Sequence, residues 1–286
     1  MKIFSVLFLA FCSLILSCGH AKHELTVMTF NVRFDNPADG ENRWEARIPI
    51  VKSYMAEATP DIVGMQEVLV NQVEDLLDIM PGYAYVGTGR DDGKTGGEYS
   101  PIYYREDRFI LRDDGQFWLS ETPGVPGSRS WDAAITRIVA WAALEVRQSG
   151  EIIYIFNTHF DHRGVQARLN SIELMSEMIT GIAGDAPVIV VGDFNIRKSS
   201  DDYEFMINTF NETNGLTNAE VISGSPVTGA ESTFNAFRTD TEPRVIDYIF
   251  VDGNFSVTSY RVDKVMENGI FISDHWPVVA EVSYRK

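Results

Sequence analysis

Carboxylate, amide and imidazole side chains follow apolar, β-type segments at several separate places in this sequence. A hydrophobic core rejects such groups unless they are hydrogen-bonded, paired with an opposite charge or bound to a ligand. Each motif alone is a weak indication of function, because each also has an ordinary structural explanation. The motifs occupy residues 29–32, 66–67, 157–162, 192–195, 246–249 and 273–278.

Three of these side chains are predicted at strand ends. Glu67 follows the apolar residues 62–65, so its carboxylate lies at the edge of the interior, where it must be paired or bind a metal. An acidic group at the start of the next helix explains Glu67 equally well. Asp193 and Asn195 are two residues apart after residues 188–191, so they project to the same side of an extended chain. An Asx turn that closes the strand is the favoured explanation of this motif alone.

Asp247 and two histidines are further candidates. Asp247 lies inside an apolar segment, where an unpaired charge costs several kcal/mol of desolvation, so it needs a partner. His275 is suitable, because a buried carboxylate on one imidazole nitrogen fixes the tautomer and leaves the other nitrogen for chemistry. His159 ends the apolar residues 152–156, where a purely structural histidine is the commoner explanation. His162 is interpreted as a cap of the following helix, outside the site.

Short β-type segments alternate with helical patterns from residue 25 onward, and no low-complexity linker or repeat interrupts them. Apolar residues at helical spacing predict a helix from Trp44 to Ala58, a second helix after Asn71 and a third from Val165 that is closed by Gly181. The predicted strands span residues 25–30, 62–65, 83–86, 102–104, 116–119, 138–146, 152–157, 188–191, 245–251, 257–265 and 278–282.

The strand pattern also indicates how the sheets are covered. Residues 152–156 and 188–191 show little alternation of polar and apolar side chains, so these strands must be covered on both faces. Two sheets packed against each other, with helices outside, satisfy that requirement. We therefore expect one domain over residues 25–286.

Residues 1–24 are predicted to be an export signal followed by a polar tether that contains His20 and His23. Lys2 precedes an apolar segment, and residues 15–19 resemble a bacterial lipobox with Cys18 as the lipidated residue; an ordinary signal peptide is the alternative. Cys12 and Cys18 are the only cysteines, so we expect no disulfide after cleavage. The expected location is the periplasm or the outer membrane and cell surface, with membrane contact only through the lipid anchor.

The 286 residues carry a formal net charge of −17, with a sequence pI near 4.6. This charge repels polyanions, so a stable complex with nucleic acid is not expected. A small phosphorylated substrate or an oligonucleotide remains compatible with it. The oligomeric state does not follow from the sequence.

Taken together and in this order, the motifs resemble the endonuclease/exonuclease/phosphatase superfamily, whose members include deoxyribonuclease I. Residues 130–137 are similar to a bacterial branch of that superfamily, and the leader suggests an exported member. The resemblance implies an α/β fold in four layers, α/β/β/α, with two mostly antiparallel sheets packed face to face and helices outside. The site is then expected where strand ends of both sheets meet.

By the same resemblance, Glu67 is the principal ligand of a Mg²⁺ ion, for which Mn²⁺ can substitute, with Asn31 and Asp274 close to the metal or the phosphate. Carboxylate and amide oxygens are ligands that Mg²⁺ and Mn²⁺ prefer, and such a set of ligands fits Zn²⁺ less well. One position departs from the pattern, because Arg33 stands where the abasic-site enzymes carry an acid. Metal binding through that position is therefore in doubt.

The remaining roles are also implied by the resemblance. Asp193 orients or deprotonates the attacking water, and Asn195 holds that water or a phosphate oxygen. His275, braced by Asp247, polarises the phosphoryl oxygen, while His159 contacts the phosphate from the other side.

Two arginines are predicted to bind substrate. Arg129 and Arg137 flank Trp131 and could offer a guanidinium to a second phosphate, although surface arginines in a solvated loop explain them equally well. The leading hypothesis is hydrolysis of a phosphate ester, a phosphodiester above all, by metal-assisted in-line attack of water. The alternatives are a secreted nuclease and a lipid-anchored binding protein that has lost catalysis.

Overall fold

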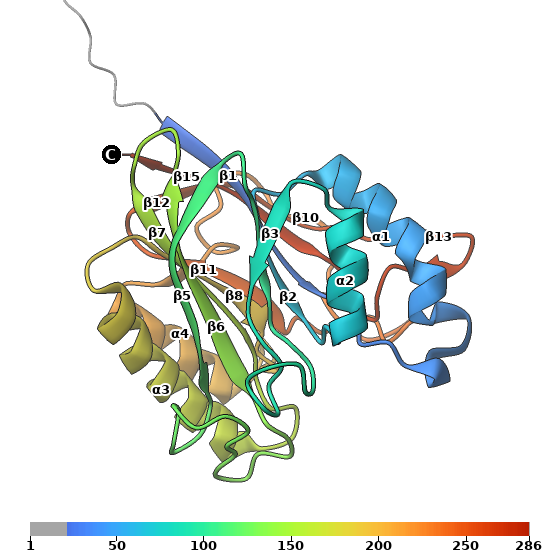
Figure 1. The fold of residues 1–286 in the computed structure, drawn as a ribbon, viewed down its shortest axis with the longest axis horizontal. Helices are drawn as coiled ribbons and strands as arrows, with labels where there is room; N and C mark the ends of the chain where they lie inside the picture. The colour runs from blue at the N-terminus through green and yellow to red at the C-terminus, as the bar shows by residue number, and fades with distance from the viewer. Residues whose placement is uncertain (1–21, 286) are drawn as a thin grey trace, which may run out of the picture.

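The computed structural model describes residues 22–285, so the predicted leader and Cys18 lie outside the described residues. Two mixed sheets pack face to face, and two helices cover the outer face of each, as expected for the four-layer α/β sandwich. One helix pair lies on the opposite side of the molecule from the other (Figure 1). The pairs are α1 (Trp44–Ala58) with α2 (Val70–Ile79), and α3 (Val165–Ala183) with α4 (Asp201–Asn214).

Most neighbouring strands are antiparallel. The first sheet has the order β10 (Thr228–Gly229), β12 (Phe255–Val262), β15 (Val278–Arg285), β1 (Lys22–Asn31), β2 (Ile62–Gln66), β4 (Ile102–Arg105) and β3 (Tyr83–Val86). The second has the order β5 (Phe109–Trp118), β6 (Ile138–Val146), β7 (Ile152–His159), β8 (Val188–Asp193), β11 (Asp247–Val251) and β9 (Thr217–Asn218). A small hairpin joins β13 (Met266–Glu267) to β14 (Ile270–Phe271), and a 3-10 helix spans Pro37–Asn42.

Two parallel strand pairs place polar residues at one end of the sandwich. In the first sheet β1 runs parallel to β2, so Asn31 lies beside Gln66, next to Glu67. In the second sheet β7 runs parallel to β8, which pairs His159 with Asp193. The antiparallel strand β11 begins at the same place, because its first residue, Asp247, also pairs with Asp193.

The two sheets approach closely at Gly64 in β2. A Cβ atom on this glycine would lie 2.3 Å from Cγ2 of Val191 and 2.8 Å from Cγ of Asn157, both in the other sheet. The buried amide of Asn157 crosses the gap: it donates to the backbone oxygens of Met65 (2.7 Å) and Pro101 (2.9 Å). It also accepts a hydrogen bond of 2.7 Å from Gln66 Nε2. These bonds fix the position of one sheet relative to the other.

Several elements differ from the sequence expectation. Helix α3 continues past Gly181, which was predicted to close it, and ends at Ala183 with Gly184 as its C-cap. Helix α4 was not predicted, because its apolar residues are few, although Ser200 before it and Gly215 after it are residue types typical of helix ends. Strand β5 begins at Phe109 rather than at residue 116. The predicted tether also ends earlier than expected: His23 belongs to β1, is buried and stacks on Tyr284 at 5.2 Å between ring centroids.

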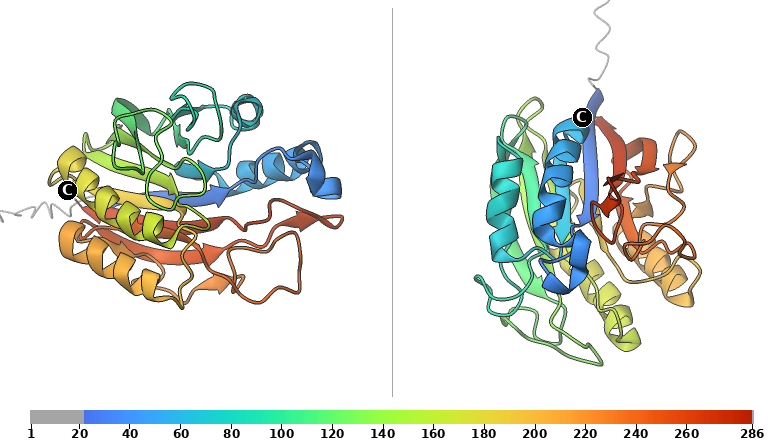
Figure 2. Two further views of the ribbon diagram at one scale, coloured as in Figure 1. Left: turned by 90° about the horizontal axis from the view of Figure 1, so that it is seen from below. Right: turned by 90° about the vertical axis from the view of Figure 1, so that its right-hand side faces the viewer.

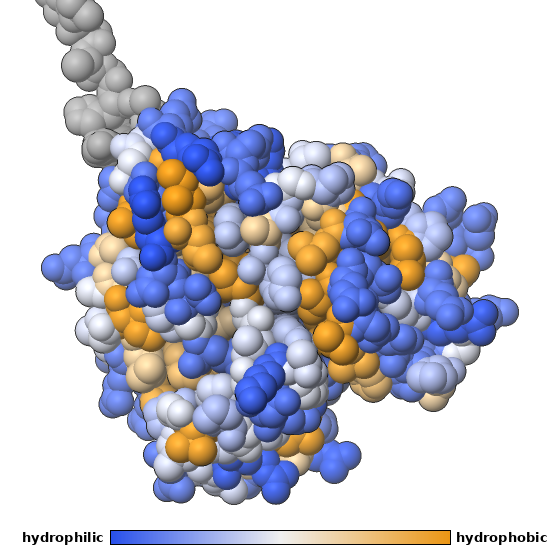
Figure 3. All heavy atoms as spheres, in the orientation of Figure 1, coloured by the Kyte–Doolittle hydropathy of each residue, from blue (hydrophilic) through white to orange (hydrophobic). Residues whose placement is uncertain are grey.

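The first and last described residues, Lys22 and Arg285, pair in neighbouring strands (Figure 2). Hydrophilic side chains are interspersed with smaller apolar patches over the face that Figure 3 shows, as expected for a strongly charged chain. Within residues 22–285, no helix combines the length and the apolar character needed to cross a lipid bilayer.

The close approach at Gly64 generates a stability prediction. We expect Gly64→Ala to lower the free energy of unfolding by about 1–3 kcal/mol, because the added methyl group must push the two sheets apart or displace Asn157. The measurement is urea denaturation monitored by circular dichroism. Gly181→Ala is the matched control, since a Cβ at that helical position meets no atom within 4 Å. An unchanged midpoint in Gly64→Ala would show that the sheets are not held this tightly.

Candidate active site

A cleft of about 570 Å³ opens at the end of the sandwich where the parallel strand pairs finish. Six residues singled out in the sequence line it: Glu67, His159, Asp193, Asn195, Asp274 and His275. Asn31 and Asp247 lie behind them and contact them. The structure therefore brings all eight predicted metal and catalytic side chains together.

Left-handed backbone conformations turn the chain sharply where it leaves the strands. Glu67 has φ 61° directly after β2, and Asn195 has φ 51° two residues after β8. Such conformations cost about 1–3 kcal/mol outside glycine and persist only where the surroundings impose them. Here the turns direct the polar side chains into the cleft.

Asp193 lies at the centre of the site. Its Oδ2 accepts a hydrogen bond of 3.1 Å from Asn31 Nδ2, and its Oδ1 accepts one of 3.0 Å from the backbone N–H of Asn195. The Nε2 atoms of His159 and His275 lie 3.4 Å and 3.7 Å from the same Oδ2. Burial raises the pKa of Asp193 to about 7, and the negative charge of Asp247 contributes to the increase. The hydrogen bonds and His275 oppose it.

The predicted pairing of Asp247 with His275 is present. Nδ1 of His275 lies 2.9 Å from Oδ2 of Asp247. Burial lowers the pKa of His275, but Asp247 and then Asp193 outweigh this effect and raise it to about 10. His275 is therefore protonated near neutral pH, with Nδ1–H donated to Asp247 and Nε2–H directed toward Asp193 and the cleft.

His159 differs from His275 in charge, although both imidazoles are buried. Burial and then the positive charge of Arg137 lower the pKa of His159 well below its usual value, so its imidazole is neutral. Nε2 of His159 lies 3.1 Å from Nδ2 of Asn195 and can accept its hydrogen bond. The site thus combines one cationic histidine, one neutral histidine and one central carboxylate.

Glu67 and Asp274 provide the oxygen atoms on the opposite side of the cleft. Nδ2 of Asn31 donates to Glu67 Oε1 at 3.1 Å, so the same amide joins Glu67 to Asp193. Nη1 of Arg33 lies 3.8 Å from Glu67 Oε2 and 3.9 Å from Asp274 Oδ2, which identifies a position where two carboxylates face a cation. A donor set made only of oxygen atoms fits Mg²⁺ or Mn²⁺.

Arg33 itself is not a metal ligand, as its residue type indicates. Its Nε and Nη2 bind both carboxylate oxygens of Asp39, at 2.9 Å and 3.0 Å. Asp35, the nearest acid in sequence, accepts a hydrogen bond from Asn71 instead of facing the cleft.

A second group of potential metal ligands consists of Asp193, Asp247 and His275, whose donor atoms lie within 4.8 Å of one another. The hydrogen bond from His275 Nδ1 to Asp247 already satisfies two members of this group. The described residues therefore offer two candidate positions for a cation: this group, and the pair of Glu67 and Asp274 beside Arg33.

Only one of the two predicted arginines lines the cleft, and a histidine that was not predicted to belong to the site lines it too. Arg137 is buried and lines the cleft. Arg129 does not: it is exposed, and its guanidinium donates to the backbone oxygen of Ala134 at 2.6 Å. His162 was placed outside the site as a helix cap, yet Gly164 is the N-cap of α3 and His162 lines the cleft. His162 belongs to the polar motif 157–162, and this feature of the sequence could have identified it as a residue of the site.

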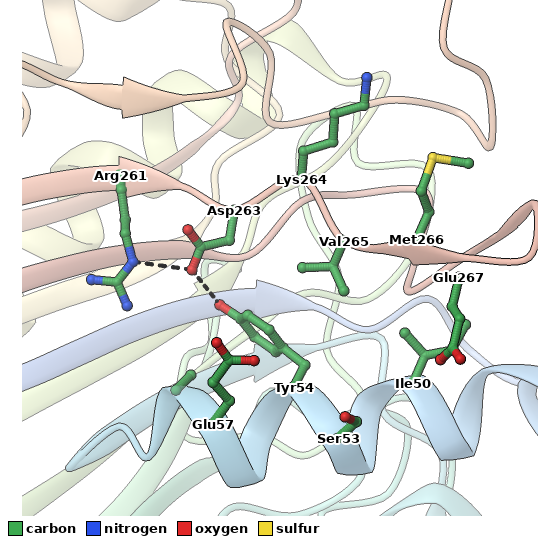
Figure 4. Close-up of a pocket in the computed structure, with 11 residues that line it drawn as sticks. Ile50, Ser53, Tyr54, Glu57, Arg261, Asp263, Lys264, Val265, Met266 and Glu267 are labelled. Carbon is green, nitrogen blue, oxygen red and sulfur yellow. Dashed lines mark hydrogen bonds and ion pairs between the residues drawn. The ribbon is translucent and has the colours of Figure 1, made fainter.

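A second concavity, of about 650 Å³, lies between α1 and the segment after β12. Figure 4 shows that Tyr54 and Arg261 are turned toward Asp263, whereas Lys264 extends away from them. Asp263 accepts hydrogen bonds from Tyr54 (2.8 Å) and from Arg261 (3.1 Å). None of the polar residues singled out in the sequence lines this concavity, so it is a weaker candidate for chemistry than the cleft at the strand ends.

Arg47 of α1 holds two segments of the site in place without lining the cleft. It is fully buried and donates to the backbone oxygens of Val32 and of Arg33 (3.0 Å), which follow β1. It also donates to the backbone oxygen of Ile272 at 3.2 Å, two residues before Asp274. The guanidinium therefore ties the segment after Asn31 to the segment that carries Asp274 and His275.

We expect Arg47→Met to lower the free energy of unfolding by about 3 kcal/mol or more, because several buried carbonyl oxygens lose their donor. Arg47→Lys keeps the charge but cannot reach every carbonyl, so its loss should be intermediate. Chemical denaturation measures both. Arg43→Met, at an exposed arginine just before the same helix, should change stability by less than about 0.5 kcal/mol. Equal stability of Arg47→Met and the wild type would rule out this positioning role.

Comparisons with known proteins agree with this geometry. A sequence model described as the Endonuclease/Exonuclease/phosphatase family matches residues 28–275. The chain is 38% identical to an endonuclease/exonuclease/phosphatase from Bacteroides vulgatus; the TM-score is 0.86, and the match covers 92% of this chain and 100% of the other. It is 35% identical to a mannosyl-6-phosphatase from Bacteroides thetaiotaomicron VPI-5482, with a TM-score of 0.82 and coverage of 90% and 99%. An uncharacterized protein of Acanthamoeba polyphaga mimivirus is 27% identical over 255 residues, which is 83% of this chain and 91% of the relative.

Proposed function

The chain belongs to the endonuclease/exonuclease/phosphatase family, and from this membership we propose that it hydrolyses a phosphate ester of a small molecule with the help of a divalent metal ion. One observation carries the proposal. The carboxylates suited to a metal and the protonated His275 line the same cleft, and Asn31 joins the two sides through hydrogen bonds to Glu67 and Asp193.

In the proposed reaction, water attacks phosphorus in line with the leaving oxygen, so one P–O bond forms as the other breaks. Asp193 orients this water and accepts its proton, while the amide of Asn195 holds the water or a phosphate oxygen. His275 donates a hydrogen bond from Nε2 to a non-bridging oxygen, and Asp247 keeps its imidazole oriented and charged. When the amide of Asn195 turns to the water or the phosphate, neutral His159 in its Nε2–H form can donate to the phosphate from the opposite side.

Glu67 and Asp274 hold the metal in this proposal, and the amide oxygen of Asn31 lies nearby. When bound, a Mg²⁺ or Mn²⁺ ion supplies positive charge to the phosphoryl oxygens. The surrounding hydrogen bonds fix the orientation of the Glu67 carboxylate, since Asn31 and the backbone N–H of Phe34 donate to its two oxygens. Such outer contacts are expected to affect metal affinity as well as geometry.

A sugar phosphate monoester is the favoured substrate class, because a relative with 35% identity over nearly its whole length is a mannosyl-6-phosphatase. A small phosphodiester, the leading hypothesis from sequence, is the second candidate. Arg137 and Arg244 line the cleft and could contact a group attached to the far side of a diester. Comparing mono- and bis-p-nitrophenyl phosphate as substrates separates the two classes.

Two other hypotheses are less favoured. A nuclease must bind a polyanion, which the net charge of −17 opposes. A binding protein without catalysis would be expected to have lost part of the site, whereas Glu67, Asp193 and His275 are all retained and face one cleft. The export signal with Cys18 lipidated stays a prediction and would place the substrate outside the cytoplasm.

Metal removal tests the first part of the proposal. We expect EDTA to abolish hydrolysis of p-nitrophenyl phosphate and Mg²⁺ or Mn²⁺ to restore it. Glu67→Gln should raise the metal concentration for half-maximal rate by about tenfold or more, because an anionic ligand is replaced by an amide. Glu242→Gln, at an exposed position, is the control and should behave as the wild type. Turnover that survives complete chelation would refute the metal requirement.

Substitutions of Asp193 and Asp247 test the second part of the proposal, which concerns the acceptance of the proton from water and the orientation of His275 toward the phosphate. Asp193→Ala and Asp247→Asn should each lower kcat by about 10²–10⁴-fold, because the first removes the proton acceptor and the second releases the orientation of His275. Steady-state rates with mono- and bis-p-nitrophenyl phosphate at saturating Mg²⁺ provide the measurement.

Asp240→Asn provides the matched control for these two variants, because Asp240 is exposed and pairs only with the exposed Arg238. It should leave the rate unchanged. Wild-type rates in Asp193→Ala, in a protein whose circular dichroism shows that it is folded, would remove the assignment of this site.

A further inference from the structure

One wall of the cleft holds a buried arginine and a carboxylate that the hydrolytic step does not use. Arg137 lies just before β6, and Glu98 lies between β3 and β4. We propose that this wall is a subsite for a hydroxyl-bearing leaving group, a sugar or another polyol, which Glu98 and Arg137 recognise together. This inference rests on the proposed function and specifies the substrate class.

Arg137 is a buried cation with unused donors. Its exposed fraction is 4%, and neither Nε nor Nη1 has a hydrogen-bond partner within residues 22–285. Nη2 lies 3.3 Å from Nδ1 of His162. A buried donor without an acceptor costs free energy, so this guanidinium is expected to bind an acceptor on a ligand in the cleft.

The nearest carboxylate is already occupied. Oδ2 of Asp161 lies 4.0 Å from Nε of Arg137, which is beyond hydrogen-bonding distance. Both oxygens of Asp161 instead accept backbone N–H groups, from Ala134 and Ile135 on Oδ2 and from Arg163 and Gly164 on Oδ1, at 2.7–3.2 Å. Asp161 therefore fixes the loops around the wall and leaves the donors of Arg137 free.

Glu98 provides an acceptor beside this donor. Its two oxygens form a bidentate ion pair with Arg90, at 2.6 Å and 3.0 Å, and its side chain keeps 16% of its exposure. A carboxylate has about four acceptor positions, so two remain for a ligand. Glu98 and Arg137 both line the cleft. Burial lowers the pKa of Arg137, and Glu98 is close enough for its negative charge to act in the opposite direction and raise it.

The pairing of a free donor with a free acceptor favours hydroxyl groups over a second anion. A hydroxyl group accepts from Arg137 and donates to Glu98, so it satisfies both. A second phosphate or a carboxylate would bind Arg137 but would also face the negative charges of Glu98 and Glu67, which line the same cleft. Ile135, on the same wall, can contact the C–H face of a sugar ring. This subsite therefore replaces the second-phosphate role first considered for Arg137.

The test compares two substrates that differ in the leaving group. Mannose 6-phosphate carries hydroxyl groups, whereas p-nitrophenyl phosphate has none on its leaving group. We expect Glu98→Gln to lower kcat/KM for mannose 6-phosphate by about tenfold or more and to change that for p-nitrophenyl phosphate by less than about twofold. Arg129→Met, outside the cleft, is the control and should affect neither.

The retained rate on p-nitrophenyl phosphate reports that the variant is folded. If Glu98→Gln does not fold, inhibition of the wild type gives the answer. Free mannose should then inhibit hydrolysis of p-nitrophenyl phosphate in competition with the substrate, and acetate, a small carboxylate without a hydroxyl group, should not. Inhibition by acetate, or the lack of inhibition by mannose, would overturn the subsite.

The outcomes for the two proposals are distinct. Equal effects of Glu98→Gln on both substrates, or no effect on either, would overturn the subsite while leaving hydrolysis intact. A wild-type protein that hydrolyses neither phosphate in the presence of Mg²⁺ or Mn²⁺ would instead refute the proposed function.

Discussion

The close contact between the two sheets is the constraint on which the site depends. Gly64 allows the sheets to meet, and the amide of Asn157 then bonds across the gap to the backbone of Met65 and Pro101. Because these contacts lie just below the ends of β1, β2, β7 and β8, they determine how far Glu67 stands from Asp193. A slip of one residue in the pairing register of one of these strands would turn its side chains to the opposite face of the sheet, away from their present partners.

Neighbouring charged groups give the buried side chains of the site different charges. Asp193, His159 and His275 are all buried, yet only His275 has a carboxylate bonded to its imidazole. His159 lies near Arg137 and stays neutral, so one histidine is a donor to anions and the other can accept a hydrogen bond. The arrangement of fixed charges around two identical side chains therefore assigns them different chemical roles.

The sequence predicted the layers of the fold and most of the site because both leave local signals. A charge inside an apolar strand, Asp247, requires a partner, and His275 was a suitable residue. Strand β7, which contains Asn157, and its neighbour β8 show little alternation of polar and apolar side chains, and this predicted that both faces of these strands are buried. Contacts between distant segments left no such signal. Arg137 is buried and Arg129 is exposed, although they are only eight residues apart. Which of the two enters the cleft depends on the tertiary folding of the loop that contains them. The positions of His162 and Glu98 at the cleft also depend on contacts between distant segments. Helix α4 has too few apolar residues to be recognised from a periodic pattern.

The guanidinium of Arg33 has a consequence for the proposed metal site. Two carboxylates in a shielded cleft repel one another, but Arg33 lies within 4 Å of both Glu67 and Asp274 and balances their charge. If these carboxylates bind a divalent ion, the internal cation would let the protein reach its folded shape before the ion arrives.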